Sequence, residues 1–311
     1  MCLGGIAALL AAIPGAVAQG LIWGIMAIGV YITFKILDVA DLTVDGTMCT
    51  GGAVCIMMIR GGCNIWVSLL CAFIAGMLAG LLTGVFHTCM GIPAILAGIL
   101  TQFGLYSINL KIMGKANQGI SGTKYDLLVS LAKLKEGNIL RNTIFIAAVF
   151  VIVLIVVLYL FFGTERGCSI RATGCNPHMS RAQGINTKAN VIIGLMISNG
   201  IVALASALYA QYQGFADVNM GRGAIVIGLA AVVIGSVCFE KLFKNFALKL
   251  LAVAFGGVIY FLVLAVVMWL GFDSDLLKLL SAIIVAVFLA VPYWKKKYFT
   301  KPVIREAEKN A

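Results

Sequence analysis

The hydrophobic positions of this chain form long runs, and the polar positions gather in short segments between them. A run of about 20 apolar residues is the length of helix that crosses a hydrocarbon core of about 30 Å. The pattern therefore predicts nine membrane-spanning helices, at residues 15–36, 44–60, 65–86, 93–113, 142–162, 189–212, 222–239, 246–270 and 276–293.

The composition supports this prediction. The chain is 62% hydrophobic and only 11% charged, whereas soluble proteins are about 45–50% apolar and about 25% charged. Many of its 35 glycines lie inside the apolar runs, as is typical of membrane helices that pack closely. We expect an all-α polytopic membrane protein with about eight to nine transmembrane helices, in a single transmembrane domain over residues 1–294.

Charge patterning gives an orientation. The net charge of +11 is better explained by basic cytoplasmic loops and anionic lipid headgroups than by nucleic acid, which we do not expect as a partner. Tyr293 and Trp294 form an aromatic pair typical of the membrane interface, and Lys295 to Lys297 follow directly. Residues 295–311 are therefore predicted to form a basic cytoplasmic tail, with the polar segment 164–188 on the same side of the membrane.

Motifs of enzymes are absent from the sequence. It has no G-x-x-x-x-G-K-[ST], no H-E-x-x-H and no G-x-S-x-G, so it lacks a phosphate-binding P-loop and two common hydrolytic sites. Its two histidines, His87 and His178, form no cluster with cysteines at the spacing of a zinc site. We expect a protein that is not an enzyme, that holds no metal or cofactor, and whose energy comes from another chain.

Polar residues crowd between the first two predicted spans, without a clear loop. Carboxylates at membrane depth persist where they are paired or face water. One interpretation is a polar pocket in the membrane, lined by Asp41, Thr43, Asp45 and Thr47. The alternative is a cytoplasmic turn in which Asp45 caps the next helix.

The segment 164–188 is a polar island between two strongly apolar runs. Ser169 or Thr173 can cap a short helix, Pro177 suits the first position of a second helix, and Gly184 is a typical C-terminal stop. The segment would then present an exposed turn that carries the apolar side chain of Met179 and the guanidinium of Arg181. The alternative is an ordinary loop on the membrane surface whose positive charge fixes the topology.

The connection at residues 114–141 has a helical pattern of its own. Leu127, Leu128, Leu131 and Leu134 recur at helical spacing with lysines between them. This pattern predicts a short amphipathic helix on the outer face, as a membrane-surface cap or as a docking surface for an outside partner.

Four stretches together resemble a known family. They are FKILDVADLTVDGTMCTGGAV (34–54), PAILAGILTQFGLYSINLKIMGKAN (93–117), residues 169–186 and residues 198–235. In this order they resemble the permeases of bacterial ABC importers of the branched-chain amino acid and ribose type. Within that group the chain looks most similar to permeases for tryptophan- or tyrosine-like substrates.

The resemblance implies a type II ABC-importer-like permease with a discontinuous second helix near residues 38–47. By this resemblance the segment 164–188, called the coupling segment below, contains a helix that docks in a groove of an ATPase, a role that an exposed apolar side chain and a guanidinium suit. The candidate contact residues are Arg171, Asn176, Pro177, Met179, Arg181, Ala182 and Gly184. Asp41, Thr43, Asp45 and Thr47 then border the translocation pathway. The implied partners are an ABC ATPase subunit that binds ATP-Mg, an extracellular substrate-binding lipoprotein and a second copy of the permease in a homodimer. The implied location is a bacterial plasma membrane.

Two other functions remain open from the sequence. One is a permease of the same type for a nucleoside or a sugar rather than an amino acid. The other is a secondary carrier without an ATPase, which would be expected to show inverted repeats with paired broken segments. The sequence shows one broken segment and no convincing counterpart in its later half.

Overall fold

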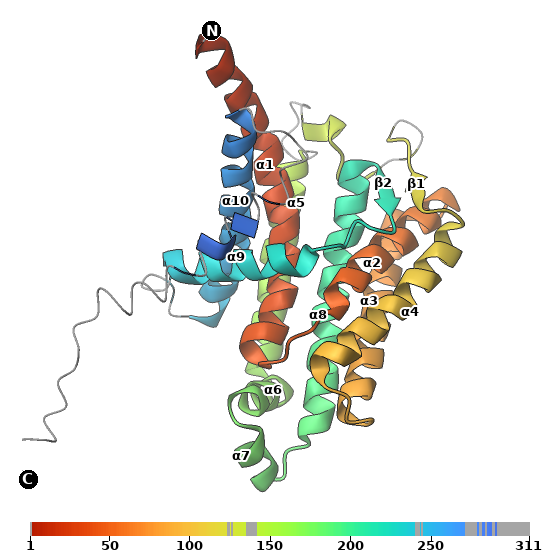
Figure 1. Cartoon of the computed structure of the whole chain (residues 1–311), viewed down its shortest axis with the longest axis vertical. Helices are drawn as coiled ribbons and strands as arrows, with labels where there is room; N and C mark the ends of the chain where they lie inside the picture. The colour runs from red at the N-terminus through yellow and green to blue at the C-terminus, as the bar shows by residue number, and fades with distance from the viewer. Residues whose placement is uncertain are drawn as a thin grey trace, which may run out of the picture.

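The computed structural model describes residues 2–122, 125, 127–134, 142–239, 243, 245–270, 279, 282–283, 285–287 and 290. Its described part is almost wholly helical (Figure 1). The helices are α1 (Cys2–Tyr31), α2 (Thr43–Arg60), α3 (Ile65–Thr88), α4 (Ala94–Met113), α5 (Thr143–Gly163), α6 (Glu165–Cys175), α7 (Pro177–Ala182), α8 (Thr187–Gln213), α9 (Ala224–Phe239) and α10 (Phe246–Trp269). A π-helical turn η1 (Ile32–Ile36) extends α1, and a 3-10 turn η2 (Ala132–Leu134) precedes α5.

Six of the described helices are long and apolar enough to cross a membrane. This finding makes the chain a multi-pass membrane protein, with fewer full-length spans in the described ranges than the eight to nine predicted. The predicted span 222–239 corresponds to α9, which has only 16 residues and runs across the molecule in Figure 1. The predicted span 44–60 corresponds to α2, which has 18 residues and is not among the six. Most of the predicted span 276–293 and the tail 295–311 lie outside the described residues.

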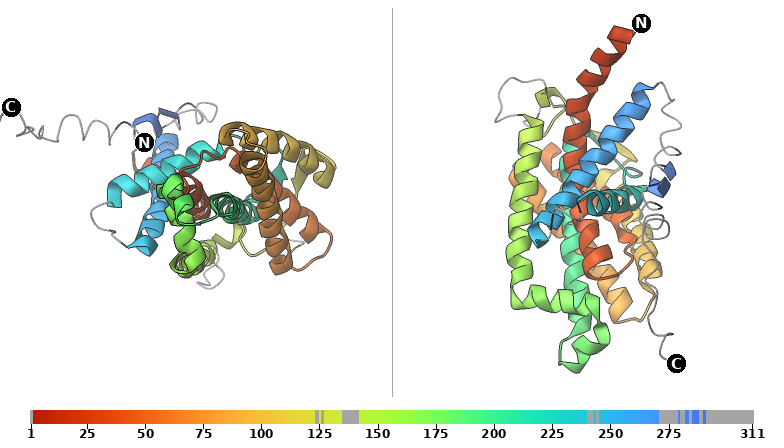
Figure 2. Two further views of the ribbon diagram at one scale, coloured as in Figure 1. Left: turned by 90° about the horizontal axis from the view of Figure 1, so that it is seen from below. Right: turned by 90° about the vertical axis from the view of Figure 1, so that its left-hand side faces the viewer.

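Helix α8 occupies the centre of the bundle. It packs against α3, α2 and α1, so that α2, α3 and α4 lie on one side of it while α1, α5, α9 and α10 lie on the other (Figures 1 and 2). Small residues permit this close packing, because a Cβ at Gly51 of α2 or Gly80 of α3 would overlap the backbone of α8.

A short two-stranded sheet joins two helix ends that are distant in sequence. Strand β1 (Asn117–Gly119), just after α4, pairs antiparallel with β2 (Phe215–Asp217), just after α8, and Gln118 lies opposite Ala216. This end of the molecule is opposite to α6 and α7 (Figure 1).

The predicted amphipathic helix over Leu127–Leu134 is wrong for most of its length. The 3-10 turn over residues 132–134 is the helical part of this segment in the described residues. Leu127 and Val129 are buried, and the backbone N–H of Leu128 donates to Gln211 Oε1 of α8 at 3.1 Å. The segment therefore packs onto the bundle through Leu127 and Val129, while Leu131 is 51% exposed.

Candidate functional site

The chain is non-helical at residues 37–42, between η1 and α2, and this segment is called the break below. Asp38 stands at its start with a positive φ of 55°, a conformation that aspartate tolerates better than most residues. Both ends of the break pack against the bundle: Leu37 lies against Gly194 of α8, and Leu42 lies against Gly98 of α4, whereas Asp38 and Ala40 between them are exposed. A discontinuous helix near residues 38–47 is expected; the described backbone is non-helical over residues 37–42, between η1 and α2, and α2 is continuous from Thr43.

Asp41 is nearly inaccessible, at 3% exposed, and both of its carboxylate oxygens accept hydrogen bonds. Oδ1 accepts from the backbone N–H of Thr43 at 2.9 Å, and Oδ2 accepts from Asn199 Nδ2 of α8 at 2.7 Å. The Thr47 hydroxyl donates to Asn199 Oδ1 at 2.7 Å. Asp41 thus caps the start of α2, and the amide of Asn199 joins it to Thr47. This set of four residues is called the Asn199 network.

The hydroxyl of Thr43 extends the network to two more helices. It lies 2.7 Å from the hydroxyl of Thr83 on α3, which in turn donates to Thr101 on α4 at 2.9 Å. Thr43, Thr83 and Thr101 are all buried. The buried polar groups are therefore satisfied within the protein, as membrane depth requires, and they fix the break relative to α3, α4 and α8.

Asp45 has a different role from Asp41. Its Oδ2 accepts from the backbone N–H of Gly223, and its Oδ1 accepts from that of Ile225, both at 3.0 Å. These groups belong to the start of α9, where a negative charge is favoured by unpaired N–H groups and the helix dipole. The alternative in which Asp45 caps its own helix is wrong, because Asp41 caps α2 and Asp45 caps α9.

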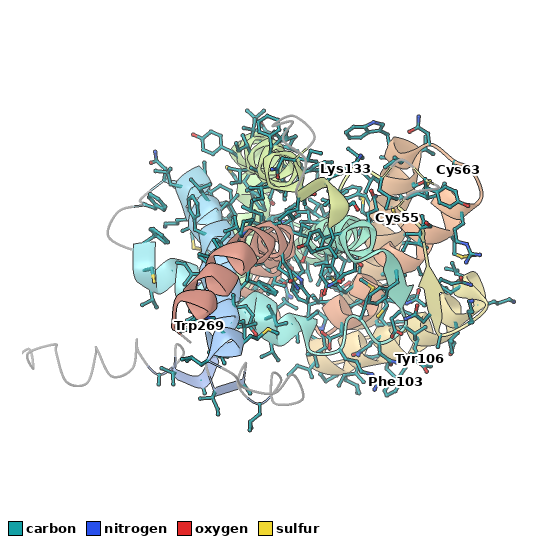
Figure 3. All side chains as sticks on the ribbon, turned by 90° about the horizontal axis from the view of Figure 1, so that it is seen from above. Cys55, Cys63, Phe103, Tyr106, Lys133 and Trp269 are labelled. Carbon is teal, nitrogen blue, oxygen red and sulfur yellow. The ribbon has the colours of Figure 1, made fainter. Side chains whose placement is uncertain are left out.

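A cavity of about 370 Å³ lies beside Asp45, and it is called the α4 cavity below. One wall comes from α2, one from α4 and one from the segment between β2 and α9. Phe103 and Tyr106 lie next to each other on the outward side of α4 (Figure 3). The lining residues are Asp45, Gly46, Cys49, Gln102, Phe103, Tyr106, Asn109, Val218 and Arg222.

The structure thus separates the four predicted pathway residues. Asp45 lines the α4 cavity, whereas Asp41, Thr43 and Thr47 are enclosed in the Asn199 network. Sequence reasoning missed Gln102, Asn109 and Arg222 as cavity residues. A signal was present for two of them, because amides at positions 102 and 109 are seven residues apart and share one face of a membrane helix.

The coupling segment forms two short helices at one end of the bundle (Figures 1 and 2). Asn176 lies between them, and its side chain accepts from the backbone N–H of Met179 at 3.0 Å. Pro177 occupies the first turn of α7, and Gly184 follows that helix with a φ of +78°. The predicted helix start at Pro177 and the predicted stop at Gly184 are confirmed, whereas the cap by Asn176 was not predicted. The predicted cap of the first helix is wrong, because Thr164 caps α6 and Ser169 and Thr173 lie inside it.

The surface of α7 is open to solvent. Asn176, Pro177, Arg181, Ala182 and Gly184 are exposed, and the apolar side chain of Met179 is 59% exposed. Arg181 also donates through Nε to Thr187 Oγ1 at the start of α8, at 2.9 Å, which holds its guanidinium in place.

Helix α6 is anchored to the rest of the bundle from three sides. Asn190 of α8 donates to Ser169 Oγ and Thr173 Oγ1, at 2.6 and 2.9 Å. The guanidinium of Arg171 lies over the ring of Phe246 of α10, 5.4 Å from its centre. Gly174 lies so close to the carbonyl oxygen of Ile36 that a Cβ would overlap it. The coupling segment therefore touches η1 directly before the break.

Comparisons with known proteins show the family of the chain. The model of the family described as branched-chain amino acid transport system / permease component matches residues 12–292. A "Tyrosine transport system permease protein" of Clostridioides difficile is 40% identical over 88% of each chain. A protein of Rickettsia prowazekii, named only as uncharacterized, is 36% identical over 88% of this chain and 95% of its own.

A more distant relative is the "Autoinducer 2 import system permease protein LsrC" of Yersinia pseudotuberculosis. It is 29% identical over 58% of this chain and 50% of its own length. No solved structure is significantly similar to this chain.

Proposed function

Because this chain belongs to the family of branched-chain amino acid transport system permease components, we propose that it forms the translocation path of an ATP-driven importer for an aromatic or branched-chain amino acid. The observation that carries the proposal is the direct contact between the coupling segment and the turn before the break. The exposed helix α7 at one end of the bundle is thereby linked, through α6 and η1, to the break that precedes α2.

The proposed mechanism follows this link. An ABC ATPase subunit, which binds ATP-Mg, docks on α7 and moves it. Helix α6 carries the motion to Ile36 through Gly174, and the break passes it to α2, since Asp41 caps that helix. Asp45 on α2 holds the start of α9, so the walls of the α4 cavity shift together. Rigid elements that pack closely transmit such motions.

The remaining partners are part of the same proposal. An extracellular lipoprotein delivers the solute, and a second copy of the permease completes the path in a homodimer. The complex lies in the bacterial plasma membrane with residues 295–311 in the cytoplasm. The chain itself holds no metal, cofactor or nucleic acid, and ATP hydrolysis occurs in the separate subunit.

A related function is the alternative. A permease of this kind for a nucleoside or a sugar would use the same coupling segment. The similarity to the autoinducer 2 import permease favours it, because the name of that relative shows a solute other than an amino acid.

Reconstitution tests the proposal. Proteoliposomes that contain the permease, the ATPase encoded beside it and the cognate receptor are expected to take up radiolabelled tyrosine or leucine only when ATP is present. Uptake of a nucleoside or sugar in place of an amino acid would support the alternative. Uptake by the permease alone, driven by a proton or sodium gradient, would reject both.

The contact between α6 and η1 yields a specific prediction. In Gly174→Ala the added methyl group overlaps Ile36 O, and such overpacking typically costs about 1–3 kcal/mol. We expect the variant to retain the ATPase on α7 but to lose uptake by about tenfold or more, since 1.4 kcal/mol corresponds to a factor of ten. Transport per hydrolysed ATP is the measurement.

Gly163→Ala is the matched control, because a Cβ at Gly163, at the end of α5, meets no atom within 4 Å. It should transport like the wild type. Equal uptake by Gly174→Ala and Gly163→Ala would show that the contact with Ile36 carries no motion.

A further inference from the structure

Asn109 of α4 has an unusual environment. Its exposure is 0%, and neither its Oδ1 nor its Nδ2 has a hydrogen-bond partner among the described residues. Buried polar side chains are nearly always paired, so an unpaired amide requires an explanation. Asn109 lines the α4 cavity, and a ligand in that cavity would supply both the missing donor and the missing acceptor.

The same face of α4 carries two further cavity residues. Gln102, Tyr106 and Asn109 are four and three residues apart, so they form one row along the helix, and all three line the cavity. From Gln102 to Asn109 the row covers roughly 10 Å at 1.5 Å per residue. By sequence Tyr106 lies between the two amides along the helix, and Phe103 lies near it (Figure 3), so the row carries aromatic surface at its middle.

One end of this row carries charged groups. Gly46 lies close to Gln102, as a Cβ added at Gly46 would be only 3.1 Å from Gln102 Cα. Asp45 is the residue directly before Gly46, so its position is close to the Gln102 end of the row. Arg222 also lines the cavity, and its neighbour Gly221 packs against the carbonyl oxygen of Asp45. No hydrogen bond or ion pair holds the Arg222 guanidinium to another described residue, so its donors are available.

We propose that the α4 cavity binds an aromatic amino acid whose ring bears a hydroxyl group, as a substrate site within the permease. This inference rests on the proposed function and specifies its substrate. Arg222 binds the carboxylate, and the ammonium lies by Asp45, whose oxygens retain acceptor capacity beyond the two N–H groups of α9. The ring packs against Tyr106 and Phe103, and the amide of Asn109 exchanges hydrogen bonds with the ring hydroxyl.

The size and polarity of the cavity suit this ligand. A volume of about 370 Å³ lies within the range of small-molecule sites, which are about 300–1,000 Å³ and combine apolar walls with a few polar groups. A site that hydrogen-bonds a hydroxyl also rejects the analogue that lacks it, because its own polar group is then left unpaired. The permease is therefore expected to bind tyrosine in preference to phenylalanine.

The test uses the full permease, purified in detergent without its receptor, with L-tyrosine and L-phenylalanine as probes. The wild type is expected to bind tyrosine more tightly than phenylalanine. Asn109→Leu should weaken tyrosine binding by about tenfold or more through the lost hydrogen bonds and leave phenylalanine binding unchanged. Its Tm without ligand should equal or exceed that of the wild type, because the substitution removes no hydrogen bond seen in the structure.

Asn199→Leu is the matched control for a structural asparagine. Asn199 is equally buried but bonds to Asp41 and Thr47, so its replacement should lower the Tm. If Asn109→Leu lowered the Tm as much as Asn199→Leu, Asn109 would have a structural role, and the proposed binding site would be rejected. It would also fall if the wild type bound neither amino acid, or bound both equally well.

Arg222→Gln provides a second measurement. It should weaken binding of tyrosine by about tenfold, as expected for a lost charge-assisted bond, but should not weaken binding of tyrosinamide, which has no carboxylate. Equal losses for both probes would contradict the assigned role. ATP-driven uptake by the wild type separates the two hypotheses: uptake without the binding pattern above rejects this site alone, whereas no ATP-driven uptake of any amino acid rejects the proposed function.

Discussion

The double substitution Met179→Asp and Arg181→Glu is expected to abolish ATP-driven uptake and to release the ATPase from the permease. Met179 is the most exposed large apolar side chain on α7, and Arg181 presents a guanidinium held in place by Thr187. A groove on the ATPase that accepts the side chains of Met179 and Arg181 would instead face a carboxylate at each of these two positions. Replacing a central interface residue of this kind typically costs about 2 kcal/mol or more of binding free energy. The double substitution should therefore weaken ATPase binding by at least about a hundredfold.

Co-purification in detergent and uptake in proteoliposomes measure the two effects. Met179→Asp alone should show most of the loss of ATPase binding. The structure has no hydrogen bond of the Met179 side chain among the described residues, so this substitution should leave the fold intact. Arg166→Glu, the same charge change at an exposed position on α6, is the control and should keep the ATPase. If the double variant retained the ATPase and transported normally, α7 would not be the docking element.

Asp45→Asn is expected to reduce uptake by about tenfold or more while the complex with the ATPase and its basal hydrolysis persist. The carboxylate of Asp45 accepts from two backbone N–H groups of α9. An asparagine offers one acceptor oxygen and turns an amide N–H₂ toward the second N–H. Losing one hydrogen bond and the negative charge at the start of α9 should cost about 1–2 kcal/mol of the interaction free energy between α2 and α9. A cost of about 1.4 kcal/mol corresponds to a tenfold lower rate. Asp45→Ala should have the larger effect.

Asp38→Asn is the matched control for this carboxylate. Asp38 lies in the same connection but is exposed, and asparagine tolerates its positive φ as well as aspartate does. Initial uptake rates at saturating ATP should therefore match the wild type. Normal uptake by Asp45→Asn and Asp45→Ala would show that the bond between α2 and α9 plays no part in transport.

Local signals in the coupling segment could be read from the sequence. The start at Pro177 and the stop near Gly184 depend on residues close together in the chain, and neighbouring backbone groups fix such motifs. The cap by Asn176 spans only three residues, but it was not predicted. The cap of α6 was misassigned to Ser169 or Thr173. Both hydroxyls have local capping propensity, but the fold places them inside α6, where they accept hydrogen bonds from Asn190.

The roles of the two carboxylates could not be read in this way. The partner of Asp41 is Asn199, 158 residues away, and the partners of Asp45 are 178 and 180 residues away. From the sequence alone, the four polar residues within positions 41–47 were equally good candidates to line a pocket. Their separation into a buried network and one cavity residue depends on which helix packs against each face of α2.

The sequence by itself determined that this chain is a helical membrane protein that resembles the permease family, with a polar break before its second helix and a polar turn that begins at Pro177 and stops near Gly184. Hydrophobic run length and local capping decide such features, because both depend on neighbouring residues and on the thickness of the bilayer. Only the tertiary structure decided that α9 is too short to be a full span, that Leu127 and Val129 are buried in the bundle, and that Asn109 is buried without a hydrogen-bond partner among the described residues. Those properties arise from contacts between segments far apart in the chain, which no local pattern encodes.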